Sequence, residues 1–475
     1  MDIILAQAMD QIKDILADMG SKWAAAVQFM YNNKGAVCLG ALSETLLEES
    51  KEEILKVLQT GLEASNKKLR NSKRVRKELG LQLKQKDRPR SVYLPVGQLN
   101  CKRDYYLDKR AGNYVYPLDI AFGMEKYVRV DATVRAELLN AAAEESYSRS
   151  AQEVTGGQIS KQSVHNYLLT CKVPVKEPQE KGKVVKDLYI YADEDHAHVR
   201  AGGTGQKTKS QIVPLVAVTE GTETVSKDRS RTQGTMYFTS PEFRGTDVWE
   251  SVSGYICNAY DVTKLEHVYV YGDGGSWIQR GLDEFPQTVH VMDGYHFQKA
   301  LHHLANVFPK RNVTQALRFR IEKGDREGVQ LYLQSLLEGA DETQTRDVNA
   351  FAIYINRNFE AIRNELTLEI PGSCTEAQVS HVLSERCSRD PIAWSEKGLS
   401  QMGRLRVLKW NSGKVQASDF NPDCEVFDYK ELLRSEMEEK IDVTFFDKQN
   451  FNFDGSSATQ RWIRSLGACR NNLTS

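Results

Sequence analysis

The chain has 475 residues and a formal net charge of −1, with 40% apolar and 27% charged residues. This length exceeds what one compact core usually supports, so several domains are expected. No apolar run approaches the roughly 20 residues of a membrane-spanning helix, and an acid at position 2 argues against a signal peptide. The eight cysteines are scattered without a C-x-x-C pair, which argues against a zinc ribbon or disulfide scaffold and indicates a reducing, cytoplasmic location.

The first 65 residues predict amphipathic helices, because apolar residues recur three and four positions apart with acids between them. A basic stretch follows, in which residues 67–90 contain eleven Lys or Arg, among them Arg74 and Arg76, and only two acids. This stretch indicates contact with DNA or another polyanion, and a solvated, partly disordered linker is the alternative. Alternating apolar and polar residues around turn signals then predict a small β unit, so residues 66–125 form the second region.

Residues 126–174 predict a helix-turn-helix. Two helices, to about Ser146 and to about Val154, precede the turn "TGGQ", and a third helix begins at Ser160, a good N-cap residue. In this motif the second helix enters the major groove of DNA, and its early residues face the bases. Those residues here are Lys161, Gln162, His165 and Asn166. An ordinary helical hairpin is the alternative.

After a linker rich in Pro, Lys and Glu, the elements follow a definite order. Strands at "LYIYAD", "HAHVRAG" and "SQIVPLVAVTEG" precede a helix ("DVWESVSGYICNAY"), a strand ("HVYVYGD"), a helix from about residue 276 and a strand ("TVHVMD"). Three strands and then alternating helix and strand is the order of a ribonuclease-H-like core, so we predict an α/β multidomain protein. Residues 183–296 form the first part of this core, 297–370 an all-helical insertion and 371–412 the last part, while the tail, 413–475, has no clear pattern.

Acidic residues follow two of these strands. Asp193 ends the first predicted strand and Asp273 ends the fourth, and these strands are neighbours in the predicted fold. Close carboxylates repel one another unless a cation lies between them. Two Mg²⁺ or Mn²⁺ ions about 4 Å apart, held by carboxylates, can clamp both oxygens of an in-line phosphoryl displacement. The pattern therefore predicts metal-dependent phosphodiester chemistry.

A third carboxylate would complete the site. Glu376 lies in the first turn of the helix after the insertion and is the main candidate, although Ser373-x-x-Glu376 also fits a capping box. Glu396, in "WSEKG", competes with it. Asp195 lies on the same face of its strand as Asp193, so it competes for the first position.

Other candidate groups flank these acids. "VMDGYHFQKAL" places Asp293 and His296 at a strand-to-helix junction, where the acid can cap the helix and the histidine can face the metal site or DNA phosphates. His196 and His198 form an H-x-H pair that a zinc hydrolase could use, although no motif supplies further ligands.

Four segments carry a resemblance to a known family: "YADEDHAHVR", "YGDGGSWIQRG", "VMDGYHFQKAL" and "SCTEAQVSHVLSERCSRDPIAWSEKGLSQMGRLR". In this order they resemble bacterial insertion-sequence transposases of the ISLre-two type, distant relatives of mutator-type transposases, over roughly residues 70–415. The resemblance implies a ribonuclease-H-like domain whose DDE triad, Asp193, Asp273 and Glu376, is interrupted by a helical insertion. It also implies cleavage at terminal inverted repeats, strand transfer into target DNA, and a homodimer or larger assembly on DNA in the bacterial cytoplasm.

Two further functions compete with this one. A nuclease of the same fold would cut DNA or RNA without strand transfer. A catalytically inert DNA-binding protein would keep the acids for structural reasons and would bind DNA without metal.

Overall fold

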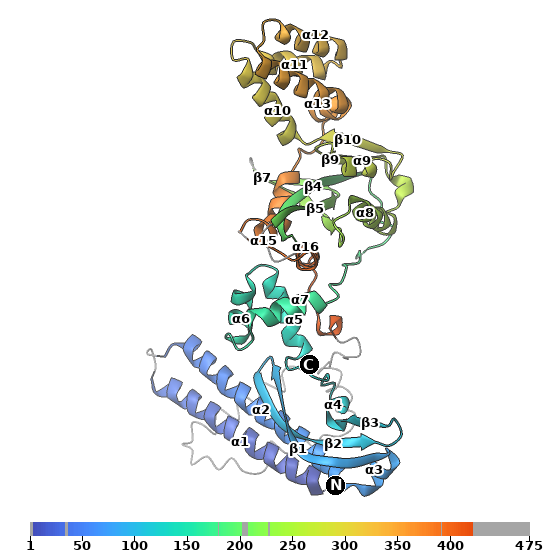
Figure 1. Cartoon of the computed structure of the whole chain (residues 1–475). Coiled ribbons are helices and arrows are strands. Elements are labelled where there is room, and N and C mark those ends of the chain that lie inside the picture. The colour runs from blue at the N-terminus through green and yellow to red at the C-terminus, as the bar shows by residue number, and fades with distance from the viewer. Residues whose placement is uncertain are drawn as a thin grey trace. The chain divides into compact units, whose positions relative to one another are not determined.

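The structure is a computed structural model that describes residues 3–33, 37–178, 180–201, 208–226, 229–390 and 392–420. These residues form a mixed α/β protein with a five-stranded, a three-stranded and a two-stranded sheet (Figure 1). Within these ranges, no helix combines the length and the apolar character needed to cross a membrane. Most of the predicted tail, residues 413–475, lies outside the described residues.

The N-terminal helices α1 (Ile3–Asn32) and α2 (Leu39–Asn71) pack against each other and confirm the predicted helical region. Lys22 of α1 bonds to Glu49 and Glu53 of α2, with Nζ–Oε distances of 3.1 and 3.0 Å. α2 continues past residue 65, so the predicted limit of the first region falls inside a helix.

The basic stretch is regular in structure, so the disordered-linker alternative is wrong. It comprises the end of α2, the short helix α3 (Lys73–Glu78) and most of β1. The predicted small β unit is confirmed as an antiparallel sheet of β1 (Leu81–Leu94), β2 (Gly97–Asp108) and β3 (Asn113–Val115), followed by α4 (Pro117–Ala121).

The helices predicted for the helix-turn-helix are present as α5 (Ala132–Ala142), α6 (Tyr147–Thr155) and α7 (Lys161–Thr170). Gly156 ends α6 in the left-handed conformation, with φ of 58°, which glycine adopts without steric cost. The Ser160 hydroxyl caps α7 by accepting a hydrogen bond from the Ser163 N–H at 3.2 Å.

The central sheet has the strand order β10–β9–β4–β5–β8. β5 runs antiparallel to both of its neighbours, β4 and β8. The other four strands all run in the same direction. The strands are β4 (Asp187–Arg200), β5 (Thr208–Thr219), β8 (Met236–Thr239), β9 (His267–Gly272) and β10 (Thr288–Met292).

The prediction of separate strands at "LYIYAD" and "HAHVRAG" is wrong, because both belong to β4. Asp193 therefore lies inside a strand, paired with Leu215 of β5, and does not end one. Asp193, Asp195 and Ala197 are all buried and alternate with more exposed residues, so the strand continues through them. The prediction ended the strand too early because two residues on its buried face are acids. The third strand of the sheet is β8, which was not predicted; it follows a hairpin of β6 (Gly221–Ser226) and β7 (Arg229–Gln233).

Helices cover both faces of this sheet, as the alternating residues of β4 require. On one face Ile190 and Ala192 pack with α8 (Gly245–Ala259) and α9 (Ser276–Gly281). A short 3₁₀ turn (Val262–Lys264) and β9 lie between these two helices in the chain. On the other face Tyr191 and Val199 share a core with α5–α7 and with the helices after the insertion. Those helices are α14 (Thr375–Val379), a π-helical turn (Ser380–Ser384), α15 (Glu385–Cys387) and α16 (Glu396–Trp410).

The region predicted as a helical insertion is helical and follows β10. Its helices form a bundle with its own apolar core, and the last of them packs against β10 (Figure 1). They are α10 (Gly294–Val307), α11 (Val313–Glu322), α12 (Arg326–Leu337) and α13 (Glu342–Thr367).

Two glycines allow a matched test of the packing between α8 and α9. A Cβ at Gly281 would overlap the buried Trp249 ring, whereas a Cβ at Gly254 meets nothing within 4 Å. We expect Gly281→Ala to lower the free energy of unfolding by about 1–3 kcal/mol through overpacking. Gly254→Ala, inside α8, should raise it by roughly 0.5–1 kcal/mol. Urea unfolding measures both, and equal effects would contradict the packing described.

Candidate carboxylate site

The parallel strands β9 and β10 end level with the middle of β4. Tyr191 of β4 pairs with Tyr271 of β9, and Gly272 pairs with Met292 of β10. Asp193 and Asp273 come two residues after the tyrosine pair, and the N–H of the residue after Met292 bonds to the Gly272 carbonyl at 3.0 Å. The register therefore gathers Asp193, Asp273 and Asp293 where β9 and β10 end.

Asp193 is buried, with 8% of its surface exposed, and its Oδ1 accepts a hydrogen bond from the Glu194 N–H at 2.8 Å. The pKa of Asp193 is raised to about 6, mainly by burial, with the negative charges of Asp273 and Glu376 adding to the effect and the Glu194 N–H and His296 opposing it. The three predicted carboxylates therefore share one electrostatic environment.

Asp273 begins a tight loop after β9, and its exposed carboxylate accepts a hydrogen bond from the Gly275 N–H at 2.8 Å. Gly274 adopts φ of 86°, and a Cβ there would lie 2.6 Å from Oδ1 of Asn358 in the insertion. The positive φ favours glycine at this position, and a larger residue would also have to displace the Asn358 side chain.

Glu376 lies in the first turn of α14, which packs against β4. The predicted capping box is wrong: the N-cap residue is Cys374, and the Ser373 hydroxyl bonds instead to the Thr375 hydroxyl at 2.6 Å. The Glu376 carboxylate is exposed and forms no hydrogen bond within the described part of the chain. It is therefore free to turn toward a ligand.

Asp293 caps α10, as predicted, by accepting a hydrogen bond from the Tyr295 N–H at 3.1 Å. Its other oxygen lies 3.1 Å from Nδ1 of His296. Burial by itself would raise the pKa of Asp293, but the hydrogen bonds from His296 and Tyr295 outweigh it and lower that pKa. In turn the bond to Asp293 raises the pKa of His296, which favours an imidazolium beside the carboxylates.

The structure separates the roles of Asp193 and Asp195, although both side chains lie on one face of β4. Oδ1 of Asp195 accepts hydrogen bonds from the hydroxyls of Ser384 and Ser388 at 2.9 and 2.7 Å. Asp195 is buried, and its Oδ2 has no hydrogen-bond partner within the described residues. Asp195 therefore ties β4 to the segment that follows Glu376.

The remaining candidates lie apart from this site. Glu396 is exposed and forms an ion pair with Lys209 at 2.6 Å, and its charge is not among those that shift the pKa of Asp193. His196 and His198 are exposed on the face of β4 opposite to Asp193. Glu194 shares that opposite face and accepts a hydrogen bond from Trp277 of α9.

Helix α13 of the insertion contributes groups that no sequence motif indicates. The Tyr354 hydroxyl is buried without a hydrogen-bond partner in the described residues; burial and the charges of Asp273, Asp293 and Glu365 raise its pKa. Burial likewise raises the pKa of Glu365, with Asp293 adding to it. Asn358 interrupts the helix with φ of −114° and ψ of 16°. These residues lie far from the acids in sequence, so only tertiary packing reveals them.

The residues predicted to contact DNA bases lie on α7. Lys161, Gln162 and Asn166 are exposed, and Gln162 donates to Asn166 at 3.1 Å. His165 is half-buried, with its ring 5.6 Å from that of Tyr147. Three of the four side chains are therefore accessible to a ligand.

The two arginines predicted from the basic stretch both have internal partners. Arg74 is exposed and bonds to Glu78 at 2.9 Å. Arg76 donates to the Leu69 carbonyl at 3.2 Å.

The donor set suits a hard cation, because carboxylate oxygens are the ligands that Mg²⁺ prefers. The raised pKa of Asp193 has the cause that a cation would remove, namely buried and mutually repelling negative charge. Among the described residues, however, no three His, Cys, Asp or Glu side chains already converge on one metal position. The carboxylates influence one another electrostatically, but their oxygens do not form a closed coordination sphere.

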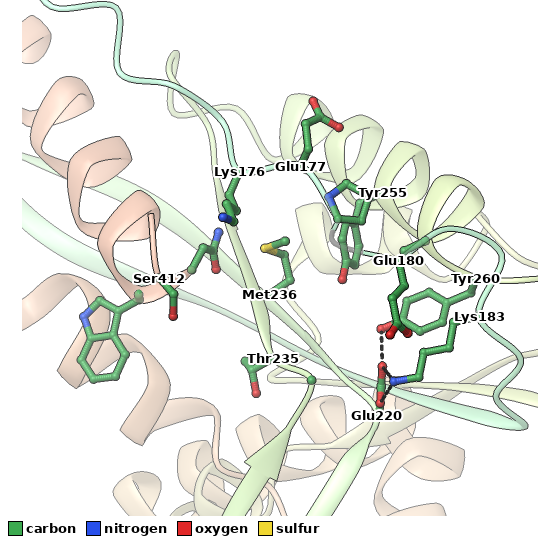
Figure 2. Close-up of a pocket in the computed structure, with 15 residues that line it drawn as sticks. Lys176, Glu177, Glu180, Lys183, Glu220, Thr235, Met236, Tyr255, Tyr260 and Ser412 are labelled. Carbon is green, nitrogen blue, oxygen red and sulfur yellow. Dashed lines mark hydrogen bonds and ion pairs between the residues drawn. The ribbon is translucent and has the colours of Figure 1, made fainter. Parts of the chain in front are cut away.

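A pocket of about 330 Å³ lies at the other end of the strands (Figure 2). Its wall includes Lys183, just before β4, and Glu220, just after β5. The Lys183 ammonium bonds to both Glu220 carboxylate oxygens at 2.8 Å, and the Tyr260 hydroxyl donates to the same carboxylate at 3.2 Å (Figure 2). These groups satisfy one another, and the pocket contains none of the predicted site residues.

The sequence model described as "Uncharacterised protein family (UPF0236)" matches residues 33–422. The chain belongs to the UPF0236 family. A UPF0236 protein of Caldanaerobacter subterraneus subsp. tengcongensis is 31% identical over 358 residues, 75% of this chain and 75% of that protein. A second from the same organism is 30% identical over 421 residues, 87% of this chain and 80% of that protein. These names give the family and state no activity.

One solved structure covers 68% of the UPF0236 chain and 90% of its own chain, at 10% sequence identity. Its title is "Drosophila P element transposase strand transfer complex". The TM-score is 0.19, which is too low to establish a shared fold. The site of this UPF0236 protein is therefore interpreted from its own residues.

Proposed function

We propose that this protein is a DNA transposase of the DDE kind, which cleaves DNA at transposon ends and transfers the freed end into target DNA. The main support is the gathering of Asp193, Asp273 and Glu376, from three separate segments, where β9 ends beside β4. The strand order β8–β5–β4–β9–β10, with only β5 antiparallel, supports a ribonuclease-H-like core. The motif resemblance to ISLre-two-type transposases supplies the reaction class.

In this proposal Asp193, Asp273 and Glu376 hold one or two Mg²⁺ or Mn²⁺ ions. Asp193 is fixed by burial, whereas Asp273 and Glu376 are exposed and can rotate. Bound divalent ions would neutralise the negative charge that develops on phosphate during in-line displacement.

The neighbouring residues orient the substrate phosphate. His296, held by Asp293, presents an imidazolium beside Asp193 and Asp273. A water oxygen attacks phosphorus, the bond from phosphorus to the 3′ oxygen breaks, and that oxygen takes a proton to become the 3′-hydroxyl. The oxygen of this 3′-hydroxyl then attacks phosphorus of a target phosphodiester with the same geometry and loses its proton. The bond from that phosphorus to its own 3′ oxygen breaks, and this oxygen takes a proton and leaves as a new 3′-hydroxyl of the target strand. No covalent protein intermediate is required.

The DNA itself is bound by other parts of the chain in this proposal. Exposed residues at the start of α7 read the terminal repeat in the major groove. Joining two ends requires two active sites, so the protein acts as a homodimer or larger assembly on DNA, in the bacterial cytoplasm.

The test uses the full chain, a labelled duplex taken from the DNA that flanks its gene, and a target plasmid. With Mg²⁺ or Mn²⁺ we expect a nick at a defined 3′ end and a joined product, and with a chelator neither. Cutting of any duplex without joining would support the nuclease alternative. Binding without cutting under all conditions would support the inert DNA-binding protein.

A further inference from the structure

The small sheet β1–β2–β3 carries a cluster of tyrosine rings and arginines. The rings of Tyr105 and Tyr114 stack with centroids 5.2 Å apart, and the Tyr116 ring lies 4.7 Å from that of Tyr105. The Arg88 guanidinium lies over Tyr105 at 5.0 Å, and the Arg103 guanidinium lies over Tyr116 at 3.7 Å. Five side chains from three strands and the segment after them therefore form one cluster, in which Arg103 is nearly buried and paired with Asp119 of α4.

This cluster lies on the open face of the sheet. Tyr105 and Tyr106 are consecutive in β2, so their side chains point to opposite faces. Tyr106 is fully buried, and its hydroxyl donates to Asp104, which is bonded to Arg70 of α2. Tyr114, on the other face, is 54% exposed. The Tyr114 ring is thus exposed to solvent while it stacks on Tyr105.

β1 carries two further cations close to Arg88 in sequence. Lys84 and Lys86 are exposed, and two register shifts of the edge strand surround them. Within the described residues, Lys84, Lys86 and Arg88 form no ion pair and donate no hydrogen bond. Other arginines nearby are neutralised, as Arg70 is by Asp87. Uncompensated positive charge on a small sheet favours a polyanionic ligand.

We infer that this surface, defined by Lys84, Lys86, Arg88 and Tyr114 and called the sheet patch, binds the phosphodiester backbone of duplex DNA. The inference rests on the proposed function and adds a second DNA-binding surface, separate from α7. An arginine stacked on a ring keeps its N–H edge free for a phosphate. Lysines on an edge strand also prevent edge-to-edge pairing of sheets. That role explains neither the open ring of Tyr114 nor the stacked Arg88.

The test compares two variants of the full chain, each with three positive charges removed. The sheet variant carries Lys84→Gln, Lys86→Gln and Arg88→Gln. The control carries Lys264→Gln, Lys310→Gln and Lys323→Gln, at exposed lysines outside the sheet. Binding to a short duplex of arbitrary sequence is measured against salt concentration. Each lost phosphate contact makes the slope of log K against log salt shallower by about 0.9, so we expect a change of about 2.7 for the sheet variant and none for the control.

The outcomes separate this inference from the proposed function. Wild type that binds no DNA would overturn both. Wild type that binds, with the same slope in the sheet variant or an equal change in the control, would overturn the sheet patch alone. A loss confined to single-stranded DNA would overturn the duplex assignment. Size-exclusion chromatography of the sheet variant detects aggregation, which would identify the edge-protection role instead.

Discussion

Asp193→Asn is expected to slow metal-dependent DNA nicking by about 10²- to 10³-fold or more, because it removes charge from a site that stabilises a developing negative charge. Asp273→Asn and Glu376→Gln should behave alike, since the three carboxylates act on one another. DNA binding should persist, because none of the three lies on α7 or on the sheet patch. Single-turnover nicking and binding, measured on the same preparations, check both expectations.

Glu396→Gln is the matched control for Glu376→Gln. Each acid lies in the first turn of its helix. Glu396, however, is paired with Lys209, and it is Glu376 whose charge contributes to the raised pKa of Asp193. We expect its nicking rate to equal that of wild type. If Glu396→Gln stopped the reaction and Glu376→Gln did not, the third carboxylate would be Glu396.

The same Asp193 variant has a predicted effect on stability in the absence of metal. The folded protein raises the pKa of Asp193 from 3.8 to about 6, so it holds this proton more tightly than the unfolded chain does. The resulting stability is present below about pH 4 and is lost as the pH rises to about 6. At pH 8, Asp193→Asn should therefore raise the free energy of unfolding by about 1–3 kcal/mol, and at pH 4 it should not. Added Mg²⁺ should stabilise wild type and not the variant.

Local sequence patterns predicted much of this fold because apolar residues in most of its helices and strands recur with the period of that element. The glycine turn before α7, the Asp293 cap and the alternation of helix and strand after α8 all depend on near neighbours in sequence. The prediction that divided β4 into two strands was wrong because it too relied on neighbouring residues alone. The buried face of β4 carries carboxylates, so its sequence lacks the apolar alternation by which a strand is predicted. Its twelve pairs with β5 nevertheless continue through Asp193.

The candidate site was predictable where a residue follows a strand or begins a helix, and Asp193 was predicted although it lies inside β4. Asp273 follows β9 directly, and the resemblance in motifs indicated Glu376. Tyr354 and Glu365 reach the same site from the end of a long insertion, and no local signal marks them. Contacts between residues so far apart in sequence depend on how the whole chain packs, which a pattern of neighbours cannot encode.

Asp195→Ala should have the opposite effect to Asp193→Asn, although the two acids lie side by side on β4. It removes two hydrogen bonds to a buried carboxylate and leaves the hydroxyls of Ser384 and Ser388 without that acceptor. Hydrogen bonds to charged groups contribute about 1.5–3 kcal/mol each, partly offset here by relief of the unpartnered Oδ2, so we expect a loss of about 2–4 kcal/mol. Chemical unfolding measures it.

Ser384→Ala and Ser388→Ala, alone and combined with Asp195→Ala, complete a double-mutant cycle. Coupling between Asp195 and each serine would establish that the carboxylate anchors the segment after Glu376 to the strand that carries Asp193. If Asp195→Ala instead left stability unchanged and abolished nicking, Asp195 would be the metal ligand. The assignment of Asp193 would then be wrong. Two acids two residues apart are thus separated by the sign of their effect on stability, which sequence periodicity could not distinguish.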